Sequence, residues 1–173
     1  MIIVITGISA SGKSTVAELV ALRLPRSAHV RGDTFRRMVV GGRAEMTPEP
    51  SQEALRQLDL RHRLTAEVAD GYAEAGFTAV VQDVLLGEQL AAFPGMLRTR
   101  PVHVVVLAPS VEAVERRERE RRKTGYGEFT VAQLDAVLRA ETPPMGLWLD
   151  TSDQTPDETA DEILQRLTEA QVG

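Results

Sequence analysis

The sequence predicts an α/β layered fold in which helices cover a buried sheet. Short apolar runs recur along the chain with helical segments between them, at residues 2–6, 28–31, 78–82, 102–107 and 146–149. The fourth run is rich in β-branched valine and does not alternate with polar residues. That pattern is typical of a strand buried on both faces of a parallel sheet. The alternation of such strands with helices therefore predicts an α/β domain.

The composition predicts one domain, residues 1–173, because domains usually hold about 100–200 residues. Hydrophobic residues make up 43% and charged residues 26% of the chain, which excludes a disordered protein. The absence of cysteine excludes disulfides, thiolate zinc sites and a cysteine nucleophile. The three histidines share no metal-ligand spacing, and a net charge of -5 argues against a nucleic acid partner.

No segment predicts a membrane or export function. The apolar start at residues 2–6 is too short to cross a bilayer and lacks the basic flank of a signal peptide. No run approaches about 18 apolar residues. We expect a soluble, cytoplasmic protein with no membrane partner, and the sequence leaves its oligomeric state open.

Two helices have clear boundaries in the sequence. Leu60, Leu64, Val68 and Tyr72 repeat at four-residue spacing before Gly76, which predicts one long helix that ends at this glycine. A last helix begins with proline and acids at residues 155–158. Turns or loops are expected at residues 41–42, 93–95, 125–127 and 143–144.

One motif dominates the functional interpretation. Residues 7–15 read GISASGKST and satisfy the phosphate-binding pattern GxxxxGK[ST] between a buried strand and a helix that begins at Ser14. Such a loop surrounds phosphates with backbone N–H groups, Lys13 reaches the β- and γ-phosphates, and Ser14 completes a Mg²⁺ shell. The expected ligands are ATP or GTP with Mg²⁺. The expected nucleotide-binding residues are Gly7, Ser9, Ala10, Ser11, Gly12, Lys13, Ser14 and Thr15.

Asp33 is the first candidate for the acceptor side of a small kinase. The chain contains no Asn-Lys-x-Asp stretch, so a signalling GTPase is not expected. A kinase needs a carboxylate that orients the acceptor hydroxyl and takes its proton. Asp33 follows the second strand, at the sheet edge where ligands bind, and Gly32 allows close backbone approach. The alternative is that Asp33 caps a helix that starts at Thr34.

Asp83 is the second candidate, because it follows the third strand at the same edge of the sheet. Its carboxylate could bind Mg²⁺ through water, share the base role with Asp33 or position the acceptor hydroxyl. The alternative is a solvated turn residue. Ser14 and Asp83 are therefore the candidate metal ligands.

An arginine-rich helix follows the fourth strand and precedes glycines 125 and 127, which suit a movable lid. Arg117 and Arg121 share one helix face and are the favoured pair for stabilising the transferred phosphoryl group. Arg119 and Arg122 form the competing pair. The alternative for most of these charges is a solvated helix face.

Several other side chains allow both a functional and a structural interpretation. Arg36, a candidate substrate contact, Arg37 and the arginines of residues 61–63 could bind the acceptor or lie on the surface. His62 is expected at the surface or at a polar edge of the long helix. Trp148 is expected in the core.

In the order and spacing of these motifs the chain resembles the small P-loop kinases of the nucleoside monophosphate kinase-like group, and among them the chloramphenicol phosphotransferase-like proteins. The resemblance covers most of the chain and includes Asp33, residues 82–87, the arginine helix and residues 149–152. It implies a P-loop NTPase fold with a five-stranded parallel sheet flanked by helices, a lid, ATP as donor and a small-molecule hydroxyl as acceptor. It also implies that Thr151 and Ser152 lie beside the adenine. Gln82 replaces the first acid of that family's Asp-Asp pair.

The sequence therefore predicts an ATP- and Mg²⁺-dependent phosphotransferase acting on an antibiotic-like molecule or a metabolite. Two other functions remain open. One is a nucleotide or nucleic-acid-end kinase, in which arginines of residues 36–37 and 61–63 bind an acceptor phosphate. The other is a nucleotide-binding regulatory or toxin-like module with little turnover.

Overall fold

The computed structural model describes residues 1–120, 127 and 129–173, and it confirms the α/β fold. A parallel sheet has the strand order β2-β3-β1-β4-β5. The strand bounds are Ile2–Thr6 for β1, Ser27–Arg31 for β2, Thr78–Gln82 for β3, Val102–Leu107 for β4 and Leu147–Leu149 for β5. A further strand, β6 (Gln171–Val172), pairs antiparallel with the start of β4. Two residues carry no periodic pattern, so β6 was not predictable from the sequence.

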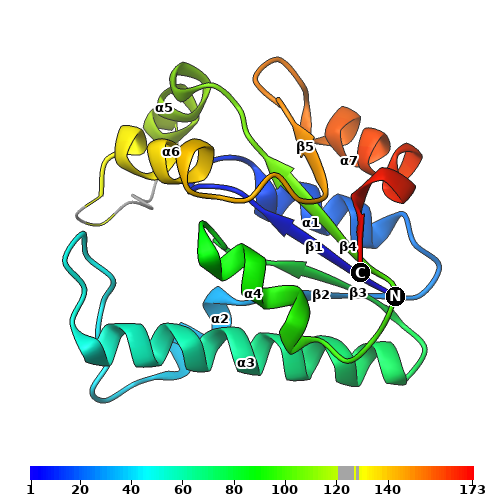
Figure 1. Ribbon diagram of the computed structural model, residues 1–173. Coiled ribbons are helices and arrows are strands. Elements are labelled where there is room, and N and C mark those ends of the chain that lie inside the picture. Colours follow the sequence, from blue (N-terminus) through cyan, green and yellow to red (C-terminus); the bar gives the residue numbers. More distant parts are fainter. Residues whose placement is uncertain (121–126, 128) are drawn as a thin grey trace.

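Helices cover both faces of the sheet (Figure 1). The helix bounds are Lys13–Leu22 for α1, Asp33–Met38 for α2, Gln52–Glu74 for α3, Glu88–Met96 for α4, Val111–Glu120 for α5, Val131–Ala140 for α6 and Pro156–Gln165 for α7. The helices α1 and α7 pack on one face with the 3-10 turn Leu167–Ala170, whereas α3, α4 and α6 pack on the other. None of the helices in the described part of the chain is long and apolar enough to cross a membrane.

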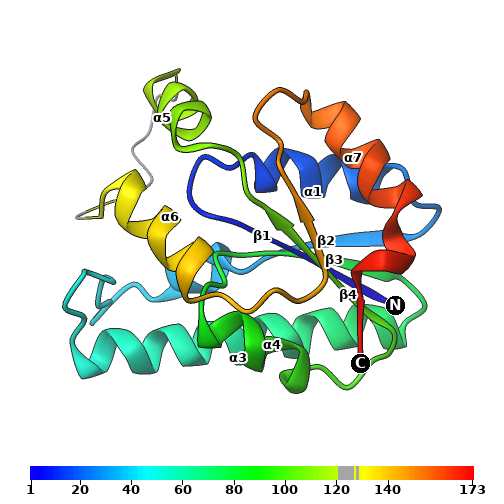
Figure 2. The ribbon, with the colours of Figure 1, turned by 45° about the horizontal axis from the view of Figure 1, so that its top comes forward.

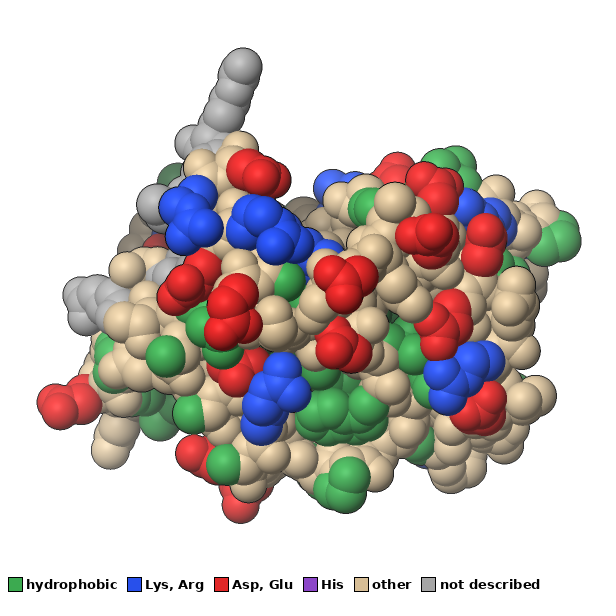
Figure 3. Space-filling view, turned by 90° about the horizontal axis from the view of Figure 1, so that it is seen from above, with side chains coloured by type: hydrophobic (Ala, Val, Ile, Leu, Met, Phe, Trp, Pro, Cys, Tyr) green, Lys and Arg blue, Asp and Glu red, His purple; other side chains and the backbone are tan. Residues whose placement is uncertain are grey.

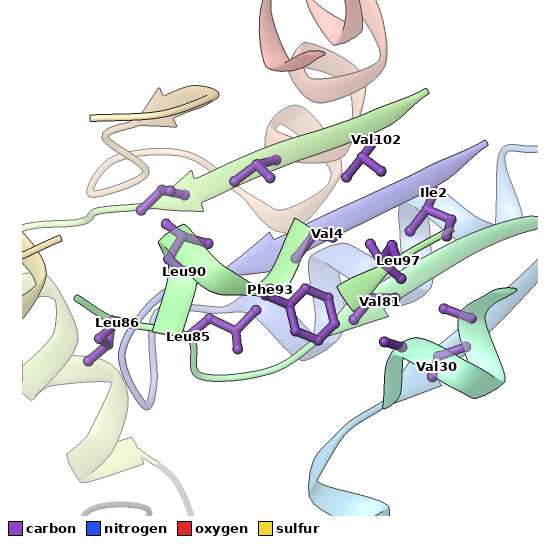
Figure 4. Packing of buried hydrophobic residues seen from close by; sticks show 14 of the residues in the cluster. Ile2, Val4, Val30, Val81, Leu85, Leu86, Leu90, Phe93, Leu97 and Val102 are labelled. Carbon is purple, nitrogen blue, oxygen red and sulfur yellow. The ribbon is translucent and has the colours of Figure 1, made fainter. Parts of the chain in front are cut away.

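Both faces of the central strand β1 are covered by helices, which explains why residues 2–5 are all apolar. Ile3 and Ile5 face the cluster under α1 and α7, while Ile2 and Val4 face the cluster under α3 and α4. All four side chains are fully buried. Phe93 of α4 belongs to the cluster under α3 and α4, as do Val4 and the other side chains labelled in Figure 4. A strand covered on both sides needs apolar residues at every position.

The end of the long helix α3 is confirmed. Gly76 adopts a φ of +83°, its N–H donates to the carbonyl of Ala73 (3.0 Å), and Phe77 N–H donates to the carbonyl of Tyr72 (3.0 Å). These two bonds form the glycine-dependent stop of a Schellman motif. Leu60 and Tyr72, which predicted the helix, are 39% and 45% exposed. The face that α3 buries instead carries small and polar residues, namely Ala54, His62, Thr65, Ala66, Ala69 and Asp70.

The prediction of a loop at residues 93–95 is wrong, because Phe93, Pro94 and Gly95 belong to α4. Leu90 and Phe93 are buried in the core and hold this segment against the sheet. The helix ends within one turn of the proline, and Leu97 N–H donates to the carbonyl of Pro94 (3.3 Å). Burial of the two apolar side chains therefore outweighs the local preference against proline and glycine in a helix.

The predicted start of α7 is confirmed, whereas α1 begins one residue earlier than expected, at Lys13. Thr155 caps α7 by accepting a bond from Glu158 N–H, and the Glu158 side chain accepts a bond from Thr155 N–H in return. This reciprocal pair fixes the start of the helix.

Candidate nucleotide and acceptor site

Hydrogen bonds join the segments at the carboxyl ends of strands β1, β2 and β3. Gly32 N–H, after β2, donates to the carbonyl of Gln82 at the end of β3 (3.0 Å). Thr6, at the end of β1, donates its hydroxyl to the carbonyl of Leu85 and accepts from Leu85 N–H, each at 2.9 Å. The loop after β1 and the candidate carboxylates after β2 and β3 therefore lie at one edge of the sheet, as is usual for ligand sites in α/β folds.

The loop between β1 and α1 depends on two glycines. A Cβ atom on Gly7 would lie 2.6 Å from the carbonyl oxygen of Leu107 and 2.7 Å from the Oγ of Ser11. Gly12 has a φ of +95° and is the N-cap of α1. A side chain at the first position would collide with β4, and one at the second would strain the backbone. Both glycines of the motif are therefore needed for the shape of the loop.

The same loop borders a hollow of about 140 Å³ at the N-terminus of α1. The lining residues are Ala10, Gly12, Lys13, Ser14, Thr15 and Arg117. Lys13 is 7% exposed, and its Nζ donates to the carbonyl of Ile8 (3.0 Å). Helix N-termini favour anions because their first N–H groups have no partner within the helix. The hollow thus has the position and the polarity of a phosphate site.

Helix α5 carries Arg117 to the loop between β1 and α1, and Figure 2 shows how α5 and α1 are arranged. Arg117 donates to the carbonyl of Ser11 (3.2 Å) and to the carbonyl of Thr151 (2.5 Å). Burial, together with the positive charge of Arg116, lowers the pKa of Arg117. The structure thus brings together Arg117, Ser11 and Thr151, three residues predicted to bind nucleotide or phosphate.

Two hydroxyl groups near this arginine are buried without a hydrogen-bond partner among the described residues, those of Ser11 and Thr151. Ser152 is not in this position, because its Oγ donates to Asp150 (2.5 Å) and accepts from Ser110 N–H (2.8 Å). Unpaired buried hydroxyls cost free energy, and a bound ligand or water would supply the missing hydrogen bonds.

The other predicted members of the arginine helix do not join this site or cannot be placed. Arg119 is exposed at the end of α5. Arg121, Arg122 and residues 123–126 of the predicted lid lie outside the described residues.

Asp33 does not cap α2, so that interpretation is wrong. Gly32 is the N-cap, and Asp33 is the first residue of the helix. Its carboxylate instead accepts hydrogen bonds from Arg36 (3.2 Å) and Arg37 (2.6 Å), and Arg61 lies 4.0 Å away. Burial alone would raise the pKa of Asp33, but the two hydrogen bonds and the charge of Arg61 outweigh it and lower that pKa.

Asp83 is fully buried, so the interpretation as a solvated turn residue is wrong. Arg61 donates two hydrogen bonds to its carboxylate, one of them from Nε at 2.9 Å, and Val84 N–H donates a third at 2.7 Å. A Cβ on Gly32 would lie 1.9 Å from Oδ2 of Asp83. Glycine at position 32 therefore makes room for this carboxylate, not only for a ligand.

Arg61 is the residue whose position the sequence did not reveal. It stands on α3, 22 residues before Asp83, and it is surrounded by other arginines in the sequence. Its side chain is only 13% exposed and lies between the carboxylates of Asp83 and Asp33. Arg63, two residues later, is exposed and pairs with Asp59 at 2.9 Å. These two arginines differ in burial and in partner because α3 packs beside β3 with only one of its faces.

The expectation that His62 lies at the surface or at a polar edge of the long helix is wrong, because it is 4% exposed. Its ring meets Phe93 edge to face, with 6.2 Å between the centroids. Burial lowers the pKa of His62, so the neutral ring is favoured. Trp148, by contrast, packs on the core as expected and donates to the carbonyl of Met145 (3.1 Å).

Charges of both signs are mixed over the face viewed in Figure 3, where Lys and Arg side chains lie next to Asp and Glu. No broad field of one sign covers that face. Long polyanions bind most strongly to extended basic surfaces.

Residues 2–144 match the model of a protein family described as an AAA domain. The chain belongs to this family. A "UPF0200 protein" of Aeropyrum pernix is 32% identical to this chain over 136 residues, which are 78% of this chain and 72% of the relative.

Solved structures share the fold of this AAA domain. A sugar kinase from Janibacter sp. HTCC2649 has a TM-score of 0.71 at 23% identity, covering 98% of this chain and 95% of its own. The Mycobacterium tuberculosis APS kinase, solved with AMPPNP and APS, has a TM-score of 0.69 at 22% identity, covering 96% of each chain. A Deinococcus radiodurans tunicamycin resistance protein has a TM-score of 0.67 at 17% identity, covering 99% of this chain and 98% of its own. The fold is therefore that of P-loop kinases.

Replacing Gly32 with Ala should lower the free energy of unfolding by about 1–3 kcal/mol, as overpacking does. The added methyl would displace the Asp83 carboxylate from Arg61. Urea unfolding measures this loss. Gly71→Ala is the matched control, because a Cβ there meets nothing within 4 Å and should stabilise α3 by about 0.5–1 kcal/mol. Equal stability of the two variants would contradict the close packing at Gly32.

Proposed function

We propose that this protein is a cytoplasmic kinase that uses ATP and Mg²⁺ to phosphorylate a hydroxyl group of a small molecule. The observation that carries the proposal is the hollow at Lys13 and Ser14, which shares one sheet edge with the Asp33 carboxylate. The names of the similar structures support it, because they include a sugar kinase and an APS kinase bound to AMPPNP. We extend the proposal to the chloramphenicol phosphotransferase-like group, so that chloramphenicol is one candidate acceptor.

The nucleotide binds with its phosphates in the hollow. Backbone N–H groups of residues 7–15 surround the β-phosphate, and Lys13 exchanges its bond to the carbonyl of Ile8 for the β- and γ-phosphates. Arg117 is already held by two backbone carbonyls, so its charge is fixed beside the loop before the nucleotide arrives. Thr151 and Ser152 bind the adenine, and we assign Arg121 together with Arg117 to stabilising the transferred phosphoryl group.

The residues of the hollow fit a Mg²⁺ ion that arrives with the nucleotide. Such an ion keeps several waters and takes one or two protein oxygens beside the phosphates, and the Ser14 hydroxyl stands at the hollow for that purpose. Mg²⁺ would neutralise charge on the phosphate oxygens. Asp83 fits less well as a ligand, because its carboxylate already accepts three hydrogen bonds. We therefore assign Mg²⁺ to Ser14, and we assign Asp83 to holding Arg61.

Asp33 orients the acceptor hydroxyl. Its pKa is lowered by Arg36 and Arg37, which makes the carboxylate a weak base but keeps it ionised as a hydrogen-bond acceptor. Phosphoryl transfer passes through a loose transition state, so positioning the attacking oxygen matters more than removing its proton early. Arg61, on α3, lies 4.0 Å from the Asp33 carboxylate and places a further positive charge beside it.

The first test is transfer of label from γ-³²P-ATP. Purified protein should label at least one pool among alcohols, sugars, aminoglycosides, chloramphenicol, nucleosides and a 5′-hydroxyl oligonucleotide. Lys13→Ala should reduce the label to background, because the γ-phosphate loses its cation. Arg26→Ala is the control, since Arg26 stacks on Phe77 outside the hollow. Full transfer by Lys13→Ala would contradict the proposed phosphate site.

Asp33→Asn should lower kcat by about 100-fold to 10,000-fold, as loss of such a group usually does, while ATP affinity stays nearly unchanged. Since the pKa of Asp33 lies below its ordinary value, the wild-type rate should show no Asp33 titration between pH 8 and pH 5. Steady-state kinetics over that range and ATP titration measure both effects. Asp59→Asn is the control, since Asp59 pairs with Arg63 on the exposed side of α3. Loss of ATP binding in Asp33→Asn alone would place Asp33 in the nucleotide site instead.

A further inference from the structure

A second hollow, here the α1–β2 hollow, lies at the edge of the sheet and shares no lining residue with the hollow at Lys13. It measures about 420 Å³ and is bordered by the second half of α1, the start of β2 and the residue before β3. Sites for small organic molecules usually measure about 300–1,000 Å³. Its apolar wall consists of Ala21, Leu22, Leu24, Pro25 and Phe77. The α1–β2 hollow thus has the size and the apolar lining of a ligand site.

His29 is the polar side chain of this hollow that lacks a partner. Its side chain is 11% exposed, and its Nε2 is buried without a hydrogen-bond partner among the described residues. The other ring nitrogen, Nδ1, lies 3.0 Å from Oε2 of Glu18, which also accepts a hydrogen bond from Arg31. Because a carboxylate only accepts hydrogen bonds, Nδ1 carries a proton that it donates to Glu18.

The unpaired Nε2 is therefore a hydrogen-bond acceptor. Burial, together with the charge of Arg31, outweighs the Glu18 carboxylate and lowers the pKa of His29, so the neutral ring is favoured. A neutral ring with its proton on Nδ1 keeps a lone pair on Nε2. Ser27, in the same hollow, does not supply the donor, because its hydroxyl donates to the carbonyl of Ala21 (2.5 Å). A ligand with an O–H group would complete this buried acceptor.

The charges at the rim select an aromatic molecule and disfavour an amine. Glu18 is paired with Arg31, whereas Arg26 has no carboxylate partner among the residues that the structure describes. The guanidinium of Arg26 lies over the Phe77 ring, 4.4 Å from its centroid, and donates to the carbonyl of Ala75 (3.1 Å). Such a cation repels ammonium groups and attracts the negative face of an aromatic ring.

We propose that the α1–β2 hollow binds a small aromatic molecule that carries a hydroxyl group, a phenol in chemical class. The hydroxyl donates to Nε2 of His29, and the ring packs against Leu22, Leu24 and Phe77. Arg26 stands at the rim and accepts a neutral or an anionic phenol. The proposal does not depend on the proposed kinase activity, because the two hollows have no residue in common.

The experiment follows the histidine ring nitrogens by long-range ¹H–¹⁵N NMR, with Mg-AMPPNP present so that the probe cannot enter the hollow at Lys13. The His29 signals are assigned by their absence in His29→Phe. Nε2 should resonate as an unprotonated nitrogen, and phenol should shift it in a saturable manner. Toluene is the matched probe, because it has the shape of phenol, is more apolar and lacks the donor. It should bind about threefold or more weakly than phenol, since the hydrogen bond is lost.

Leu22→Asp provides a second test that does not alter the ring, and it should fold because Leu22 is 74% exposed. It should weaken phenol binding about fivefold or more, since the new carboxylate would lose water when the ring binds. Leu55→Asp is the matched control, an exposed leucine of α3 outside the hollow, and should bind phenol as wild type does. A proton on Nε2, phenol that binds no tighter than toluene, or equal phenol affinity of Leu22→Asp and Leu55→Asp would overturn the proposal.

Discussion

The buried ion pair between Asp83 and Arg61 is the constraint on which the arrangement of charged side chains around Asp33 depends. A fully buried carboxylate is stable only when its oxygens are paired, and Asp83 satisfies this need with Arg61 and Val84 N–H. The pair joins the end of β3 to α3. The Asp83 carboxylate also packs against Gly32 at the end of β2, where a side chain would collide with it. The long helix is thereby fixed at the distance from the sheet at which Arg61 also faces Asp33.

The two halves of the site are built by different means. Backbone groups, two glycines and a helix N-terminus form the phosphate hollow, so its shape depends on few side chains. Ion pairs of more exposed side chains form the half proposed to bind the acceptor, where Arg36 and Arg37 pair with Asp33. Side chains of that kind can be exchanged without disturbing the sheet. A fold built in this way can carry sites for unlike ligands.

The sequence was sufficient for the features that local patterns determine. Strands such as β1 and β4 are mostly apolar because both their faces are covered, and the loop of residues 7–15 has a fixed spacing of glycine, lysine and serine. It was not sufficient where distant segments pack. Arg61 and Arg63 look alike in the sequence, and His62 looks polar, yet the rotation of α3 against the sheet buries His62 and pairs Arg61 with Asp83. Pro94 likewise indicated a loop, because the local sequence does not show that Phe93 is buried and holds this segment in a helix.

The central claim is that Asp83 acts by holding Arg61 and does not ligate Mg²⁺. Its most direct test is calorimetric titration of Mg-AMPPNP into Asp83→Asn, at a temperature where circular dichroism shows the variant to be folded. The account predicts a dissociation constant within about twofold of wild type, since Ser14 and the phosphates still hold the ion. Weakening by about tenfold or more in Mg²⁺, with affinity for metal-free AMPPNP unchanged, would contradict the account and assign Asp83 to the metal.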